Sequence, residues 1–430
     1  EMGQWCAYPD FSEIPKYTGV YRAKNFELFR EDLQEQGMGD EARQFLLASG
    51  KLQALCYKME VEKSLRTRDG GGFQLLSLND YPGQGTALVG VLNAFWEEKG
   101  YITAREFAHF CNTTVPLIRM KKFVFSTDEM LEAHVEVYHY GEKPLRPILV
   151  DWMLRENKGK VLGKGTMKLD VLPVGGVTDI GNIRVGLSGV KKPSALRLEL
   201  SIRGTSYYND WHCWVYPAPA ATAEGDPVYY CTELDDKAKQ VLDQGGKVFL
   251  NAYGKVVKGK EVIMSFTPVF WNTSWFKMRP PHTLGLLCDP SHPVFRYFPT
   301  EEYSDLQWWD IIEKAQPMHL EDFPMGFRPL VQPIDTWFLN RRLGLLWEAR
   351  VGKGRLVVSG ADLSPDVGAD RPAARQLYYS IRRYMQSDDF RPAYTVDYGV
   401  VQRLFTEASR RVYETHTKSG PDELRPKSTK

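Results

Sequence analysis

Residues 72–86 read GFQLLSLNDYPGQGT and pass from an apolar stretch into a cluster of amide, carboxylate and turn residues. The first half is apolar on both faces, which is typical of a strand in a parallel sheet covered by helices. Asn79 and Asp80 follow at its carboxyl end, where β/α barrels bind their ligands. Such residues also satisfy backbone groups in loops, so this pattern alone leaves a site and a plain turn equally open.

Two helical patterns precede this stretch. Residues 22–37, RAKNFELFREDLQEQG, carry Phe26, Phe29 and Leu33 at helical spacing. Residues 40–67, DEARQFLLASGKLQALCYKMEVEKSLRT, predict a long helix that tolerates one glycine. Both segments are expected to cover a sheet.

The segment after the quoted stretch also has a helical pattern. TALVGVLNAFWEEKG predicts a helix over residues 86–100, with Thr86 as its N-cap and a glycine as its stop. Thr103 and Glu106 have the spacing of a capping box, which predicts a further short helix. The alternation of helices with a strand indicates a β/α fold over residues 1–111.

The middle of the chain changes character. Residues 112–217 contain short segments, several alternating apolar with polar residues, separated by Gly, Pro, Asn and Asp turns. This spacing predicts a β-sandwich of immunoglobulin-like size. The best linker in the chain is PAPAATAEGD, residues 217–226.

Residues 226–400 return to helix and strand patterns. DDKAKQVLDQGGKVFLNAYG pairs an amphipathic helix with a strand, and LGLLWEARVGKGRLVVSGADL has the pattern of a hairpin. RPAARQLYYSIRRYM predicts a closing amphipathic helix. We therefore expect an α/β domain here, followed by a polar tail over residues 401–430.

Composition narrows the class of protein. The 430 residues are 43% hydrophobic and 25% charged, which is typical of a globular chain of several domains. A formal net charge of +1 gives no reason to expect nucleic acid as a partner. No apolar run approaches the roughly 18 residues of a membrane span, so we expect no membrane insertion.

Metal and cofactor sites lack support in the sequence. The six cysteines show neither CxxC spacing nor a cluster with histidine, so we predict no metal site and no disulfide scaffold. GQGTALVG lacks the GxGxxG spacing of a dinucleotide site, and we expect no cofactor. His134 and His139 are five residues apart in a strand pattern, so they face opposite sides and cannot easily share a metal.

Two further patterns argue against specific chemistries. An amidotransferase-like enzyme would need a nucleophilic cysteine at a strand-to-helix turn, and Cys231 and Cys288 have no such setting in the sequence. His212 lies between two tryptophans in a strand pattern, where core packing is the favoured role. We therefore expect no cysteine-based catalysis.

A second group of polar and aromatic residues opens the chain. EMGQWCAYPDF, residues 1–11, holds a carboxylate, an amide, Trp5 and Tyr8. A sugar site needs a charge for an oxocarbenium-like centre, a flat face for the pyranose and donors for its hydroxyls. The same residues fit ordinary packing at a chain terminus, and the pattern alone favours that interpretation.

These motifs together resemble one known family. EMGQWCAYPDFSEIPKYTGV followed by GFQLLSLNDYPGQGTALVGVLNAFWEEKGYI resembles the end of the catalytic barrel in multidomain glycoside hydrolases of family 2 type, the relatives of β-galactosidase and β-glucuronidase. FCNTTVPLIRMKKFVFSTDEMLEAHVEVYHYG looks like the sandwich that follows such barrels. NRRLGLLWEARVGKGRLVVSGADL looks like an appended flavodoxin- or amidotransferase-like domain. The resemblance implies the end of a (β/α)8 barrel over 1–111, an immunoglobulin-like sandwich over 112–217 and a flavodoxin-like domain over 226–400.

The resemblance also implies a site for a carbohydrate substrate. The family retains anomeric configuration by using one carboxylate as nucleophile and a second as acid/base, about 5 Å apart. Its nucleophile is a Glu at the end of a barrel strand, commonly followed by an apolar or aromatic residue and Gly, and Glu1 with the two residues after it matches that pattern. The sugar pocket would be lined by Gln4, Trp5, Tyr8, Asn79, Asp80 and Gln84. This favours a site over a plain turn at residues 72–86.

The sequence departs from the family in two respects. The family's acid/base is a Glu that follows an Asn on an earlier strand, and nothing here can hold that role. The family's N-terminal sugar-binding domain has no counterpart either. We therefore expect the C-terminal part of a longer hydrolase, inactive alone, whose open sheet edge is compatible with a homo-oligomer. The family also favours a periplasmic or extracellular location.

The alternative is a non-catalytic carbohydrate-binding or scaffold module. In that case the sandwich and the α/β domain would serve binding or oligomerisation. The sequence upstream of Glu1 in the parent gene discriminates the two, because an Asn-Glu pair at a strand end would favour the hydrolase.

Overall fold

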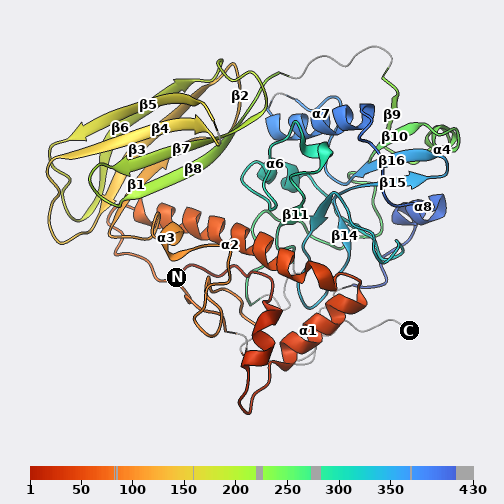
Figure 1. Ribbon diagram of the computed structural model, residues 1–430, viewed down its shortest axis with the longest axis horizontal. Coiled ribbons are helices and arrows are strands. Elements are labelled where there is room, and N and C mark those ends of the chain that lie inside the picture. The colour runs from red at the N-terminus through yellow and green to blue at the C-terminus, as the bar shows by residue number, and fades with distance from the viewer. Residues whose placement is uncertain are drawn as a thin grey trace.

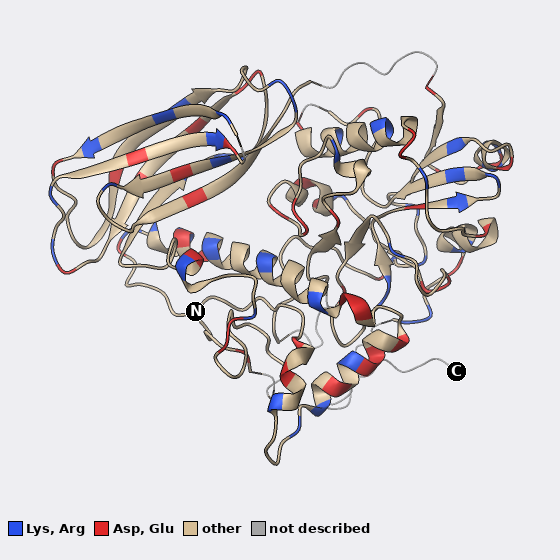
Figure 2. Cartoon of the chain, viewed as in Figure 1, with Lys and Arg blue, Asp and Glu red and all other residues tan. Residues whose placement is uncertain are grey.

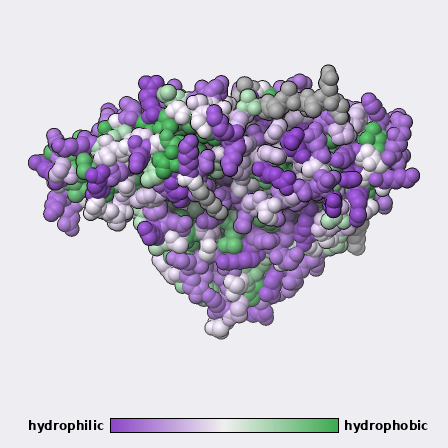
Figure 3. All heavy atoms as spheres, turned by 45° about the horizontal axis from the view of Figure 1, so that its top comes forward, coloured by the Kyte–Doolittle hydropathy of each residue, from purple (hydrophilic) through white to green (hydrophobic). Residues whose placement is uncertain are grey.

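Three parts of the molecule surround one long helix, α2 (Ala42–Leu65), as Figure 1 shows. Strands lie at one end of this helix, a mixed sheet with helices lies at the other, and the N-terminal segments lie below it. Acidic and basic residues are mixed over all parts (Figure 2), and the face seen in Figure 3 is mostly hydrophilic. The computed structural model describes residues 1–81, 83, 86–157, 159–218, 226–272, 282–368 and 370–412.

Helix α2 carries buried residues on all sides because it packs against every part of the molecule. Leu52 and Cys56 belong to the core of the α/β part. Val61 and Leu65, further along the helix, belong to a cluster that includes strand residues of the sandwich. A helix that is apolar all round is expected at such a central position.

The two helices predicted from residues 22–37 and 40–67 are confirmed, as α1 (Lys24–Glu35) and α2. The glycine inside α2 has a packing role, because a Cβ at Gly50 would lie 2.2 Å from the ring of Tyr101. Short 3-10 helices precede α1 and α2, at Phe11–Lys16 (η1) and Gly39–Glu41 (η2).

The capping box is also confirmed. The backbone N–H of Glu106 donates to the hydroxyl of Thr103 at 3.2 Å, and the Glu106 carboxylate accepts from the Thr103 N–H at 2.8 Å. The helix that it caps, α3 (Ala104–Phe107), is a single turn. Local side-chain hydrogen bonds therefore decide where this turn begins.

The helix predicted over residues 86–100 is wrong. This segment is extended and turning, and Thr86 has a φ of 52° instead of an N-cap conformation. Leu88 is fully buried, and the hydroxyls of Tyr57 and Tyr101 donate to backbone carbonyls of the segment at 2.6 and 3.0 Å. These side-chain partners, one on α2 and one just after the segment, replace the hydrogen bonds of a helix, so tertiary contacts override the helical spacing.

Two extended segments of the N-terminal part run side by side. The N–H of Met2 donates to the carbonyl of Gln74 at 2.9 Å, and the N–H of Leu76 donates to the carbonyl of Met2 at 2.8 Å, which forms a parallel bridge. Helices α1 and α2 connect the two segments. Residues 72–78 are half-buried or exposed, so the prediction of a strand buried on both faces is wrong.

Residues 114–216 form two sheets, with strand orders β1-β3-β6 and β2-β8-β7-β4-β5. Buried residues of both sheets share one core, for example Val135 of β3 and Leu198 of β7. Alternate residues of β7 are buried, as expected for a strand with one face on a core. The strands are β1 (Thr114–Arg119), β2 (Val124–Ser126), β3 (Met130–His139), β4 (Ile148–Glu156), β5 (Val161–Leu169), β6 (Gly176–Gly186), β7 (Ser194–Ile202) and β8 (Tyr208–Tyr216).

The third part contains a six-stranded mixed sheet of order β11-β13-β15-β16-β10-β9. Its strands β9, β10 and β16 are parallel, and β15 pairs antiparallel with β16, which confirms the predicted hairpin. The strands are β9 (Val228–Cys231), β10 (Lys247–Asn251), β11 (Leu286–Cys288), β13 (Val331–Pro333), β15 (Leu346–Val351) and β16 (Gly354–Ser359), beside a separate pair β12 (Met318–His319) and β14 (Leu343–Gly344).

Helices cover both faces of this sheet. Phe249 of β10 belongs to the core that includes residues of α6 and α7, whereas its neighbour Val248 belongs to the core that includes α4 and α8. The predicted helix before β10 and the closing helix are confirmed as α4 and α7. The helices are α4 (Asp236–Asp243), η3 (Pro293–Phe295), α6 (Trp308–Glu313), α7 (Pro372–Gln386) and α8 (Tyr398–Thr406).

The prediction of a polar tail from residue 401 is wrong for its first residues. Val401 and Leu404 of α8 are buried in the core of the α/β part. Apolar residues at helical spacing explain why α8 forms. The prediction missed this helix because the residues that follow it are polar. The tail beyond 412 and most of the linker 217–226 lie outside the described residues.

Glu348 of β15 is a buried carboxyl group in this part. The hydroxyl of Tyr384 donates to its Oε2 at 2.8 Å. Burial raises the pKa of Glu348 from 4.5 to about 7. The folded protein therefore holds this proton at a pH where the unfolded chain releases it.

We predict that Glu348→Gln removes a pH dependence of stability. Wild type should lose stability as the pH rises from 4.5 to about 7, because only the folded state keeps the proton in that range. A shift of this size corresponds to about 3 kcal/mol at 1.36 kcal/mol per unit. Urea unfolding at about pH 5 and about pH 8 measures the effect, and equal pH slopes in the two proteins would contradict it.

None of the described helices has the length and apolar character needed to cross a bilayer. All six cysteines carry free thiols, and five of them are buried.

Candidate functional site

Glu1 and Gln4 lie together at the start of the first extended segment. Gln4 Nε2 donates to Glu1 Oε2 at 3.4 Å, and Gln4 Oε1 accepts from the indole N–H of Trp271 at 2.9 Å. Glu1 is exposed, whereas Gln4 and Trp271 are half-buried. Gln4 is therefore oriented by an aromatic residue more than two hundred positions away, a contact that sequence patterns could not predict.

Trp5 is held by a carboxylate that the sequence did not single out. Its indole N–H donates to Glu60 Oε1 at 2.8 Å, and the backbone N–H of Gly3 donates to Glu60 Oε2 at 3.1 Å. The Trp5 ring meets the Phe270 ring edge-on, with centroids 5.8 Å apart. Glu60 lies on α2, so the long helix fixes the conformation of the segment that carries Glu1.

Tyr8 points into the protein. Its side chain is 1% exposed, and its hydroxyl donates to Asn340 Oδ1 at 2.6 Å. Its ring packs edge-on against Phe45 and Phe11. Tyr8 therefore joins the N-terminal part to the α/β part and is not brought to an open surface with Glu1.

Asp80 is also buried. It forms an ion pair with Lys99 at 2.7 Å and accepts from the backbone N–H of Gly90 at 2.9 Å. Burial raises the pKa of Asp80 to about 6 even beside this cation. The half-buried Asn79 bonds Ser77 within its own turn, and Gln84 lies outside the described residues. The predicted group is thus only partly brought together.

A cleft opens elsewhere, where α2, β8 and residues 303–306 meet, and none of the predicted site residues that the structure describes lines it. This junction cleft consists of two adjoining depressions of about 230 and 360 Å³ that share His212, Trp214 and Asp305. Clefts between parts of a fold, lined by aromatic and a few polar side chains, commonly hold small ligands. The prediction that His212 is a core residue is wrong, because it lines this cleft.

Asp210 organises the charges of the junction cleft. Its Oδ2 accepts from Arg197 Nε at 2.8 Å, and its Oδ1 lies 3.6 Å from His109 Nδ1. Burial alone would raise the pKa of Asp210, but the nearby His109 imidazole and the Arg197 charge outweigh it and lower the pKa to about 2. Burial lowers the pKa of His212, so the cleft places a neutral imidazole beside a fixed carboxylate.

One sequence feature could have indicated this cleft, namely the alternation of inward and outward residues in the strand DWHCW, residues 210–214. Trp211 and Cys213 belong to the sandwich core, so Asp210 and His212 between them must face outward. The sequence contains this alternation, but it does not contain the partners from α2 and the α/β part. The outward face therefore could not be recognised as a cleft wall.

His134 and His139 do not share a site. His139 is buried and contacts Thr114 Oγ1 at 2.7 Å, whereas His134 contacts Asp179 Oδ1 at 3.1 Å. Ligand atoms of His134, Glu136 and Asp179 all lie within 4.8 Å of one another. Because Glu136 already accepts two hydrogen bonds from Arg119, we assign no metal to this group.

Cys231 stands at a strand-to-helix turn after all, since β9 ends on it and α4 begins five residues later. The thiol is buried, and burial raises the pKa of Cys231 to about 12. A thiol of this kind is a poor nucleophile, because the reactive form is the thiolate. The setting predicted to be absent is present, but it lacks the activation that catalysis requires.

Comparisons with known proteins match two family models. Residues 129–217 match a domain of unknown function, DUF8488, and residues 229–406 match another, DUF8487. The first range ends one residue after β8, and the second begins within β9. No curated protein matches the chain.

Solved structures similar to parts of the chain include two glycosidases. The β-D-mannosidase of Dictyoglomus thermophilum is 13% identical with a TM-score of 0.34, and the match covers 49% of this chain and 26% of that one. The β-glucosidase EmGH1 of Erythrobacter marinus is 14% identical with a TM-score of 0.19, and the match covers 25% of this chain and 16% of that one. This chain thus matches about a quarter or less of each protein, and similarity this weak assigns neither fold nor activity.

Proposed function

We propose that this chain is the C-terminal part of a retaining glycoside hydrolase that cleaves a β-linked sugar. Glu1 would attack the anomeric carbon and form a glycosyl ester, which water then hydrolyses. A second carboxylic acid, supplied by a preceding part of the parent protein, would protonate the leaving oxygen and then take a proton from the water. The chain alone would therefore be inactive.

The observation that carries this proposal is the parallel bridge between Met2 and Leu75. Two parallel segments joined through helices α1 and α2 have the connectivity of a β/α unit. In barrels made of such units, the catalytic residues lie at the carboxyl ends of the strands. The bridge puts the segment that carries Glu1 beside the segment that leads to Asn79.

The predicted pocket residues divide into two roles under this proposal. Gln4 and Trp5 would contact the sugar together with Asn79 and Gln84, because an amide and an aromatic face suit hydroxyls and a pyranose ring. Tyr8 and Asp80 would instead support the framework, since both are buried and already paired. Secretion to the periplasm or outside the cell stays a prediction from the family.

The test is hydrolysis of a panel of aryl β-glycosides by the full-length parent. Glu1→Gln should lower turnover by roughly a thousandfold or more, because it removes the covalent step. A 2-deoxy-2-fluoro glycoside of the best substrate should leave a sugar ester on Glu1, detected by mass spectrometry of the peptide. The matched control is Glu31→Gln, an exposed carboxylate of α1. Turnover of the Glu1 variant near wild type would refute the assignment.

A non-catalytic carbohydrate-binding module is the second candidate, and the junction cleft favours it. This cleft contains aromatic, histidine and amide side chains, and the predicted nucleophile contributes nothing to it. A parent that binds an oligosaccharide without cleaving any glycoside of the panel would support this alternative.

A further inference from the structure

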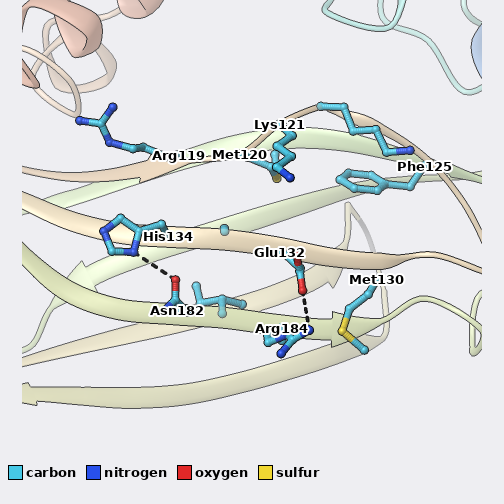
Figure 4. Close-up of a pocket in the computed structure, with 12 residues that line it drawn as sticks. Arg119, Met120, Lys121, Phe125, Met130, Glu132, His134, Asn182 and Arg184 are labelled. Atoms are coloured by element: carbon cyan, nitrogen blue, oxygen red, sulfur yellow. Dashed lines mark hydrogen bonds and ion pairs between the residues drawn. The ribbon is translucent and has the colours of Figure 1, made fainter.

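Two grooves adjoin on the surface of the sandwich. The sheet groove, of about 500 Å³, lies over β3 and β6 and is lined by residues that include Lys121 and Arg184 (Figure 4). The α2 groove, of about 510 Å³, lies between α2 and the sandwich and is lined by residues that include Lys63. Arg119 and Met120 line both grooves, so an extended ligand could occupy the two together.

Most of the charged side chains in the walls of these grooves are positive. Only Glu62 and Glu132 contribute carboxylates to the lining, and Glu129 and Glu136 pair with cations from behind. The seven cations of the lining outnumber these four carboxylates: Lys58, Arg66, Arg119, Lys122 and Arg184 form ion pairs with them, and Lys63 and Lys121 complete the seven. Concentrated positive charge of this kind attracts anions.

A buried carboxylate holds Arg119 in place. The Nε of Arg119 donates to both carboxylate oxygens of Glu136 at 2.9 Å. The Glu136 side chain is 6% exposed, whereas that of Arg119 is 54% exposed. This arrangement uses the Nε edge and keeps the guanidinium at the surface, where its Nη groups can bind a carboxylate or sulfate bidentately.

Apolar side chains lie between the cations. Met130 is 48% exposed, and Met120 and Phe125 line the sheet groove beside it. Figure 4 shows Glu132 and Arg184 directed toward one another, and the two form an ion pair at 2.7 Å. A polymer of acidic sugars offers alternating charged groups and apolar C–H faces, which matches walls of cations with an apolar strip between them.

We propose that the two grooves bind an anionic polysaccharide. This proposal rests on the hydrolase proposed above. Positive charge alone would suit any polyanion, and the proposed glycosidase activity is the reason for choosing a sugar polymer. Its anionic groups pair with Arg119, Lys121 and Arg184, and its sugar rings lie against the methionines. The grooves thus hold the polymer while another part of the protein acts on it.

The test measures affinity for polygalacturonate and for its fully methyl-esterified form, which has the same backbone without charge. Wild type should bind the charged form, and added salt should weaken that binding. The double variant Lys121→Glu with Arg184→Glu should lose about tenfold or more in affinity, which is about 1.4 kcal/mol or more. The matched control is Lys164→Glu with Lys168→Glu, two exposed lysines of β5 that line neither groove.

The other possible results of this experiment distinguish a failure of the groove proposal from a failure of the hydrolase proposal. Equal affinity for both polymers, or equal losses in both double variants, would overturn the groove proposal and leave the hydrolase untouched. Tighter binding of poly-glutamate or single-stranded DNA than of polygalacturonate would replace the sugar with a different polyanion. Charge-dependent binding in a parent that cleaves no glycoside would support the grooves and reject the hydrolase.

Discussion

Glu62→Gln should destabilise the protein by about 3–5 kcal/mol, the cost of removing one partner from a buried ionic group. Glu62 of α2 is 6% exposed and accepts from Asn209 Nδ2 at 2.9 Å and from the Trp211 indole at 3.1 Å. Burial alone would raise the pKa of Glu62, but the charges of Lys58 and Arg66 outweigh it and lower the pKa. Without the carboxylate, the largely buried Lys58 loses its ion-pair partner, and Arg66 keeps only the more distant Glu136, at 3.6 Å.

The measurement is the free energy of unfolding in urea, together with hydrogen exchange of β8. Because Asn209 and Trp211 belong to β8, exchange there should rise more than in the distant strand β10. The matched control is Glu233→Gln, which breaks an exposed ion pair with Lys255 and should cost at most about 1 kcal/mol. A loss in Glu62→Gln no larger than in the control would contradict the prediction.

Lys99→Met should cost a similar amount, about 3–5 kcal/mol near neutral pH. The side chains of Lys99 and Asp80 are 1% and 3% exposed. Burial alone would lower the pKa of Lys99, but the charge of Asp80 outweighs it and raises the pKa. In the variant, Asp80 loses its cationic partner in the interior, so its pKa should rise above the present value of about 6.

A pH series and a second variant test this account. Since Asp80 of the variant takes up a proton more readily in the folded state, the loss of stability should shrink as the pH falls toward about 5. Lys99→Met combined with Asp80→Asn removes both charges and should recover much of the loss. A double variant as unstable as the single one would show that packing, not charge, dominates at this position.

Segments with long or local signals could be predicted from the sequence. Helix α2 has apolar residues over more than six turns, and the hairpin β15–β16 has a tight turn between two apolar runs. The capping box at Thr103 depends only on residues three positions apart. These features need no knowledge of the rest of the fold.

Features set by distant partners could not be predicted. The segment 86–100 has helical spacing, but its backbone bonds to tyrosines of other segments instead. Asp80 looked like a ligand-binding residue because its partner Lys99 lies nineteen positions later and gives no local signal. Glu60, which orients Trp5, is separated from it by fifty-five positions and was not recognised.

Helix α2 contacts both proposed sites, the segment of Glu1 and the α2 groove. Glu60 contacts the segment that carries Glu1, whereas Lys63, less than one turn further along, lines the α2 groove. Neighbouring turns of a helix cannot slide independently, because their hydrogen bonds fix a rise of about 1.5 Å per residue. A displacement of α2 caused by a polymer bound in the α2 groove would therefore also move the segment that carries Glu1. Polymer binding and catalysis would then be coupled through this one helix.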